Sequence, residues 1–144
     1  MVELYVERTI AAAPQAVFDW LADPVNLTAA PLALRAGFTK GASAPAAGVR
    51  RWVVGAGMWF EEEITAYERP RSYSYLILRS LPPFNHEGGT LTFTRAGDGT
   101  HVGWRTVYSH PVYAGGKVLE ALSLRLLRSS FAAVLAGCAN ALER

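Results

Sequence analysis

Apolar and polar residues alternate along most of the first 110 positions of the chain, and this period of two is typical of half-buried β-strands. The alternation predicts strands over residues 2–10, 33–39, 49–54, 58–67, 72–79, 87–95 and 102–110. Glycine, proline and aspartate separate the later strands at Gly55-Ala-Gly57, Arg69-Pro70 and Gly97-Asp-Gly99. Because these connections are short, the later strands are expected to form an antiparallel meander.

Helical periodicity interrupts this alternation near the start of the chain and replaces it at the end. Pro14 begins a short helix, because proline is preset for the first helical position. Its apolar stripe consists of Val17, Phe18 and Leu21. Asp23 and Pro24 end this helix and begin a second short one that runs to about residue 30. With a long helix over 116–144, the order predicts an α+β fold whose helices lie on one side of a single sheet.

The long terminal helix has an apolar surface that is too wide for ordinary packing. The apolar residues that sweep more than half of its circumference are Leu119, Leu122, Leu124, Leu126, Leu127, Phe131, Val134, Leu135, Cys138 and Leu142. Near the middle of this arc the helix carries small residues, Ser123, Ser130 and Ala141. Small side chains there leave space beneath the helix, so the pattern predicts an internal apolar cavity.

Composition narrows the class of protein. A chain of 144 residues, 51% of them hydrophobic, has the size of one domain with a real core, so we expect a single domain over 1–144. A net charge of +2 from scattered lysines and arginines argues against a nucleic-acid partner. One cysteine and three dispersed histidines argue against a disulfide or a metal site, and no cofactor is expected.

The length and position of the apolar runs indicate where in the cell the protein is expected. No run approaches about 18 uninterrupted apolar residues, so no integral membrane segment is expected. The first residues, Met1 to Arg8, carry charges at alternate positions, unlike the basic head and apolar block of a signal peptide. A cytoplasmic protein is therefore expected.

Strand parity indicates which side chains point toward the cavity, because successive residues face opposite sides of a sheet. Met58, Phe60 and Ile64 form the apolar face of their strand, and this face includes Glu62. A buried carboxylate needs a partner. Glu62 therefore forms an ion pair with Arg50 or Arg51, or orients a ligand, or acts as a general acid or base.

Parity also gathers aromatic residues on the inner face. Tyr73 and Tyr75 share one face of their strand, and Trp104, Tyr108 and His110 share one face of theirs. Rings with hydroxyl groups suit a ligand pocket, and they suit a packed core equally well. His110 is the residue of this group with an unperturbed pKa near neutrality, which makes it a candidate general acid or base.

Three segments, Glu7 to Pro24, Glu63 to Tyr75 and Gly97 to Trp104, together with the terminal helix, resemble the START-like (SRPBCC) superfamily of polyketide cyclases/dehydrases and lipid transport proteins. The resemblance implies a helix-grip fold. In this fold a curved antiparallel sheet of about seven strands wraps around a long C-terminal helix, and two short helices lie between strands 1 and 2. It also implies a cavity between the helix and the sheet.

The resemblance implies binding, with or without transport, of a small hydrophobic ligand such as a lipid, a sterol-like compound or a polyketide, by a monomer or homodimer. The candidate ligand-binding residues are Trp52, Phe60, Glu62, Tyr73, Tyr75, Trp104, Tyr108, His110, Leu127, Ser130 and Phe131. One alternative is an aromatase/cyclase or dehydratase that uses His110 or Glu62, although no catalytic motif identifies an enzyme. A second alternative is a regulator that binds a partner protein in its apolar groove.

Overall fold

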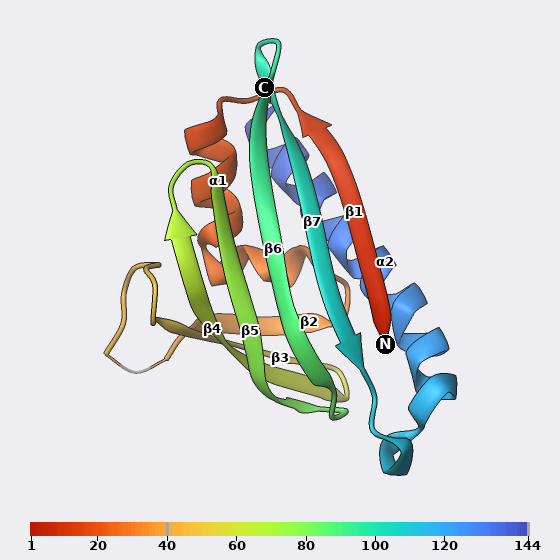
Figure 1. Cartoon of the computed structure of the whole chain (residues 1–144). Helices are drawn as coiled ribbons and strands as arrows, with labels where there is room; N and C mark the ends of the chain where they lie inside the picture. The colour runs from red at the N-terminus through yellow and green to blue at the C-terminus, as the bar shows by residue number, and fades with distance from the viewer. Residues whose placement is uncertain (40, 144) are drawn as a thin grey trace.

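A computed structural model describes residues 1–39 and 41–143 of the chain. Its elements are β1 (Val2–Ile10), α1 (Pro14–Ala22), η1 (Pro24–Ala29), β2 (Ala33–Phe38), β3 (Arg50–Gly55), β4 (Met58–Glu68), β5 (Ser72–Leu81), β6 (Asn85–Ala96), β7 (Gly99–Ser109), η2 (Val112–Ala114) and α2 (Gly116–Leu142). The strands form one antiparallel sheet in the order β1-β7-β6-β5-β4-β3-β2. The helices lie on one face of this curled sheet (Figure 1). The α+β helix-grip fold is thereby confirmed.

One end of the molecule, which we call the closed end, is packed with side chains from α1, the sheet and the second half of α2. The Phe18 ring of α1 lies 5.6 Å from the ring of Tyr73 and 5.0 Å from that of Phe93. Val134, Leu135, Cys138 and Ala139 of α2 are buried in the same cluster. Burial raises the pKa of the Cys138 thiol to about 12, so this side chain behaves as a small apolar group.

The first half of α2 is much less covered. Val118, Leu122 and Leu126 are 73%, 58% and 55% exposed, whereas the buried residues of α2 all follow Ala133. The first turns of the helix extend past the edge strand β1 (Figure 1). We call this half of the molecule, with η1, the start of β2 and the β5–β6 connection, the open end. The wide apolar arc of the helix is therefore only partly used for packing.

The sheet divides at β5 and β6, where ladder pairing covers only Ser72–Tyr75. Beyond this point the Nδ1 atom of His86 accepts a hydrogen bond of 2.8 Å from the backbone N–H of Ile77, and Nε2 lies 2.7 Å from Thr106 Oγ1. Burial lowers the pKa of His86 to about 4, which keeps the imidazole neutral and its Nδ1 lone pair available. His86 thus replaces a missing strand partner.

The predicted elements agree closely with the observed ones. Each predicted strand is present, and the second short helix is a 3-10 helix over Pro24–Ala29. β6 begins at Asn85, two residues earlier than predicted, and α2 ends at Leu142. The predicted end of the terminal helix at Arg144 lies outside the described residues.

Candidate functional site: an apolar cavity at the open end

A cavity of about 170 Å³ lies beneath the middle of α2, where residues from Ser123 to Val134 line it. Its walls come from the inner faces of β3, β4 and β7, from α2, and from the η1–β2 and β5–β6 connections. The lining residues are Leu27, Ala30, Leu32, Ala33, Val53, Met58, Phe60, Leu81, Pro82, Phe84, Trp104, His110, Ser123, Leu126, Leu127, Ser130, Phe131 and Val134. Almost all of them are apolar, so the space suits an apolar guest.

Two aromatic rings form the boundary between the cavity and the closed end. The rings of Trp104 on β7 and Phe131 on α2 are stacked, with centroids 3.8 Å apart and planes within 10°. The Trp104 indole N–H donates a hydrogen bond of 2.9 Å to the Tyr75 hydroxyl. Tyr75 can reach this position because Gly89 leaves room, since a Cβ atom at Gly89 would lie 2.2 Å from the Tyr75 ring. The wall is therefore held in place from two strands and one helix.

Two of the three small residues on the apolar arc of α2 face this space, and Ala141 is not among them. Ser123 and Ser130 both line the cavity. A serine side chain occupies less volume than the leucine or phenylalanine that a core position usually carries, so open space remains here between the helix and the sheet. The small side chains at these two positions are the sequence feature that explains the cavity.

The cavity has one polar corner, formed by Tyr108, His110 and Ser123. The Ser123 hydroxyl oxygen lies 2.9 Å from the Tyr108 hydroxyl and 2.9 Å from His110 Nε2. His110 Nδ1 lies 2.8 Å from the carbonyl oxygen of Pro83. Tyr108 and His110 are buried, and the Phe84 ring packs 5.5 Å from Tyr108 and 5.3 Å from His110. A polar group of a ligand would meet hydrogen-bonding partners at this corner.

An apolar rim surrounds the mouth of the cavity. Leu32, Leu81 and Leu126 line the cavity and are 38%, 51% and 55% exposed. They come from the η1–β2 connection, the end of β5 and α2, so the mouth lies where these segments meet. A ligand longer than the cavity can extend between them.

The Glu62 carboxylate does not reach the cavity. It forms an ion pair with Arg51 directly across the β3–β4 ladder, and both side chains are buried. Arg51 also donates to the carbonyl of Ala22 over 3.3 Å and lies 5.4 Å above the Tyr73 ring. Burial raises the pKa of Glu62, and the Arg51 guanidinium opposes that rise. Of the three interpretations of Glu62, the ion pair is the one that the structure shows.

The expectation that Trp52 faces the cavity is wrong. Arg51 must point inward to meet Glu62, so its neighbour Trp52 points to the outer face. There the indole N–H donates a hydrogen bond of 3.0 Å to the Phe38 carbonyl, and the ring covers Gly37. Trp52 fastens β3 to β2.

The remaining candidates divide between the cavity and the packed core. Phe60, Trp104, His110, Leu127, Ser130 and Phe131 line the cavity. Tyr75 and Tyr108 stand behind this wall and hydrogen-bond to its residues. Tyr73 belongs to the closed end, where its hydroxyl donates to the Leu21 carbonyl over 3.0 Å. Burial raises the pKa of Tyr73, Tyr75 and Tyr108, so all three hydroxyls are protonated donors at neutral pH.

Several cavity residues come from connections that strand parity does not address. Leu27, Ala30 and Leu32 belong to η1 and the segment after it, and Pro82 and Phe84 belong to the β5–β6 connection, which follows Leu81 at the end of β5. In the β5–β6 connection, the sequence feature that could have indicated a cavity wall is Phe84 next to two prolines, and this feature also fits an ordinary surface loop. Contacts with distant segments of the chain determine whether such residues form a cavity wall or a surface loop, and a single sequence does not reveal those contacts.

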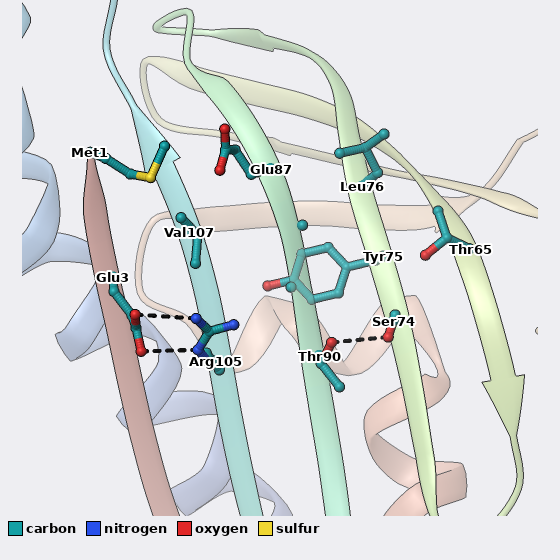
Figure 2. A pocket seen from close by; sticks show the side chains of 12 residues that line it. Met1, Glu3, Thr65, Ser74, Tyr75, Leu76, Glu87, Thr90, Arg105 and Val107 are labelled. Carbon is teal, nitrogen blue, oxygen red and sulfur yellow. Dashed lines mark hydrogen bonds and ion pairs between the residues drawn. The ribbon is translucent and has the colours of Figure 1, made fainter.

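A second, larger hollow of about 730 Å³ lies on the outer face of the sheet (Figure 2). Polar side chains line it, and pairs of them bond to each other. Arg105 makes two hydrogen bonds to Glu3, of 2.9 and 3.1 Å, and Ser74 lies 2.9 Å from Thr90. Figure 2 shows these pairs spanning neighbouring strands. They act as surface links between strands, so this hollow offers little to an apolar ligand.

No group of three or more His, Cys, Asp or Glu side chains within residues 1–39 and 41–143 is arranged to hold a metal ion. In the same part of the chain, none of the helices has the length and apolar character needed to cross a membrane. The cavity is thus defined by apolar side chains and one hydrogen-bonded corner.

Comparison with known proteins agrees with this architecture. The family model described as polyketide cyclase / dehydrase and lipid transport matches residues 1–143. The chain belongs to this family. A search of curated proteins found no match to the chain. The family assignment therefore rests on the whole length of the chain and leaves the ligand open.

Solved structures share the helix-grip fold of this polyketide cyclase and lipid transport family member. TTHA0849 from Thermus thermophilus is 19% identical with a TM-score of 0.75, over 96% of this chain and 95% of that one. XoxI from Bacillus cereus is 16% identical with a TM-score of 0.74, over 99% and 96%. DynU16, from the dynemicin biosynthetic locus, is 15% identical with a TM-score of 0.67, over 96% of this chain but 46% of its own. At these identities the likeness establishes the fold alone.

Proposed function

We propose that this protein binds a small hydrophobic ligand, with one ring or a group of similar size held in the cavity at the open end. The observation that carries the proposal is an apolar space with a single hydrogen-bonding corner at His110 and Ser123. Family membership supports it, because the family includes lipid transport proteins. Lipids, sterol-like compounds and polyketides all contain groups of this kind.

The volume limits what fits inside. An engineered protein cavity of about 150 Å³ binds benzene, and sites for drug-sized ligands are roughly 300–1,000 Å³. A cavity of about 170 Å³ therefore holds a single ring with a small substituent. The rest of a sterol-like or polyketide ligand would lie in the mouth between Leu32, Leu81 and Leu126.

The apolar wall sets the affinity. An aromatic ring that buries about 150–200 Å² contributes roughly 4–5 kcal/mol at about 25 cal/mol per Å². Association costs offset part of this, so a ring alone should bind with a Kd no tighter than about 1 mM. A longer ligand that also covers the exposed rim would bind more tightly.

Isothermal titration calorimetry with p-cresol tests this proposal. p-Cresol fills the cavity with its ring and places its hydroxyl at the His110 and Ser123 corner, whereas toluene has the same ring and no hydroxyl. We expect p-cresol to bind at one site per chain and more tightly than toluene. Absence of heat from both compounds at millimolar concentration would contradict the proposal.

An enzyme of the cyclase or dehydratase kind is the second candidate. Of the two proposed acid–base residues, His110 lines the cavity and Glu62 does not. A buried imidazole beside the hydroxyls of Ser123 and Tyr108 can transfer a proton to or from a bound ligand. Turnover of a polyketide that persists unchanged in His110→Gln would count against this role. Cytoplasmic location, and a monomeric or homodimeric state, stay predictions.

A further inference from the structure

Ser123, His110 and the Pro83 carbonyl form a continuous series of hydrogen bonds at the cavity wall. We propose that His110 activates Ser123 as a nucleophile, and that Ser123 accepts the acyl group of a small carboxylic ester bound in the cavity. This proposal goes beyond ligand binding, because it requires a reactive hydroxyl as well as an apolar space.

The direction of the hydrogen bonds follows from the Pro83 carbonyl, which can only accept. His110 Nδ1, 2.8 Å from this oxygen, must carry the proton. In the neutral imidazole Nε2 is then an acceptor, and it lies 2.9 Å from Ser123 Oγ. The Ser123 hydroxyl has two acceptors within reach, His110 Nε2 at 2.9 Å and the Glu120 carbonyl oxygen at 3.3 Å, and the nearer one is a base already oriented to receive its proton. This is the arrangement of an activated nucleophile: hydroxyl, base, and a third group that fixes the base.

Three elements bring these groups together. His110 follows β7, Ser123 is on α2, and Pro83 is in the β5–β6 connection. His110 is 4% exposed, so the base is shielded from water, and both His110 and Ser123 face the cavity. A carbonyl carbon held in the cavity can therefore approach Ser123 Oγ on the side away from the imidazole.

Tyr108 completes the corner. Since Ser123 Oγ donates to His110, its lone pairs accept the Tyr108 hydroxyl at 2.9 Å. Burial keeps the Tyr108 pKa above its ordinary value, so the hydroxyl stays a donor. During attack this donor is placed to bond to the negative oxygen that forms next to Oγ.

The reaction balances with an ester and water as reactants. Ser123 Oγ forms a bond to the ester carbonyl carbon, and its proton passes to His110 Nε2. The bond from that carbon to the leaving oxygen breaks, and the alcohol or phenol departs with the proton from Nε2. Water then attacks the acyl-serine, gives one proton to Nε2, and releases the carboxylic acid as the proton returns to Ser123 Oγ.

Ser130 provides a matched control within the same site. It lines the same cavity from the same helix, two turns beyond Ser123. Among the hydrogen bonds of the described residues, Ser130 makes none to a histidine. The two hydroxyls therefore differ in their hydrogen bonds: Ser123 bonds to His110 and Tyr108, and Ser130 bonds to neither.

Phosphylation by diisopropyl fluorophosphate, followed by intact mass and peptide mapping, tests the proposal on the wild-type protein. We expect one adduct per chain at Ser123, formed at least about 100-fold faster than at Ser130, the minimum that general base catalysis usually provides. His110→Gln should slow labelling by the same factor, and Ser129→Ala, on the exposed side of α2, should leave it unchanged. p-Nitrophenyl acetate should give an acetyl group at Ser123.

The wild-type map decides the question even if a variant does not fold. Absence of an adduct at Ser123, equal labelling of Ser123 and Ser130, or an unchanged rate in folded His110→Gln would each overturn the proposal. p-Cresol titration of the same preparation separates the two proposals: binding without labelling refutes only the nucleophile, whereas labelling that p-cresol slows supports both.

Discussion

The two ends of this molecule are built from the same sheet and the same helix, yet they are held together by different interactions. At the closed end the second half of α2 buries Val134, Leu135 and Cys138 among aromatic rings. At the open end the first half of α2 is anchored by hydrogen bonds: Ser123 bonds to the Tyr108 hydroxyl and to His110 Nε2, and the His110 backbone N–H donates to the Glu120 carboxylate over 3.2 Å.

This difference between the two ends suggests that the closed end mainly stabilises the fold and that the open end mainly serves ligand binding. The closed end is densely packed with buried apolar side chains, and a cavity there would lower stability directly. At the open end directional polar contacts hold the helix away from the sheet and preserve the space beneath it. Changes at the closed end should therefore reduce the free energy of unfolding, and changes at the open end should mainly alter binding.

The largest expected effect concerns the buried Arg51–Glu62 pair. Arg51→Met leaves the Glu62 carboxylate buried without its partner, and we expect a loss of about 3–5 kcal/mol in the free energy of unfolding. Urea denaturation measures it. The double variant Arg51→Met/Glu62→Leu, which removes both charges, should recover most of the loss. A loss below about 1 kcal/mol in the single variant would show that the pair is not a structural element of the closed end.

Filling the cavity should have the next largest effect, and on binding alone. Ser130→Leu places an apolar side chain in the space for a ligand, so the affinity for p-cresol should fall at least tenfold, or about 1.4 kcal/mol. The free energy of unfolding should change by less than about 1 kcal/mol, since the added volume enters empty space. Ser129→Leu, on the exposed side of the same helix, is the control and should bind normally.

A smaller effect is expected from pH at the division between β5 and β6. The pKa of His86 is about 4 in the folded protein, below the value of about 6.5 for an exposed histidine. As the pH falls from about 6.5 toward 4, the unfolded chain takes up a proton that the folded chain resists, so stability is lost in this window and is fully present above it.

After allowance for solvent access at His86, we expect this loss to be on the order of 1 kcal/mol. His86→Gln keeps an acceptor for Ile77 and does not titrate. Thermal unfolding of the two proteins between pH 7 and pH 4.5 should therefore show a steeper decline in the wild type. If the thermal stability of the two proteins fell in parallel with pH, His86 would not have the burial that the structure gives it.

The smallest effect is expected on the outer face. Trp52→Phe removes the hydrogen bond to the Phe38 carbonyl, which is worth about 1 kcal/mol or less in the free energy of unfolding. Because Trp52 points away from the cavity, the Kd for p-cresol should be the same as in the wild type. Weaker binding of p-cresol to this variant would show that Trp52 does belong to the binding site.

The sequence predicted the fold more completely than the site. Alternation and helical periodicity are local signals, and they located the strands and the helix whose Ser123 and Ser130 face the cavity. Parity placed Phe60 and Trp104 correctly, but it could not choose between Arg50 and Arg51, and this choice determines where Trp52 points. The approach of Pro83 and Phe84 to His110, and of Ser123 to His110, depends on long-range packing that a single sequence does not specify.

The location of bound p-cresol tests the central claim most directly. Methyl chemical shifts in NMR spectra of the protein report contacts at both ends of the molecule and on the outer face. We predict that p-cresol shifts the methyl groups of Val53, Leu81 and Leu127 at the cavity and leaves those of Val17 and Leu21 at the closed end unchanged. Shifts confined to Leu76 and Val107, on the outer face, would contradict the account.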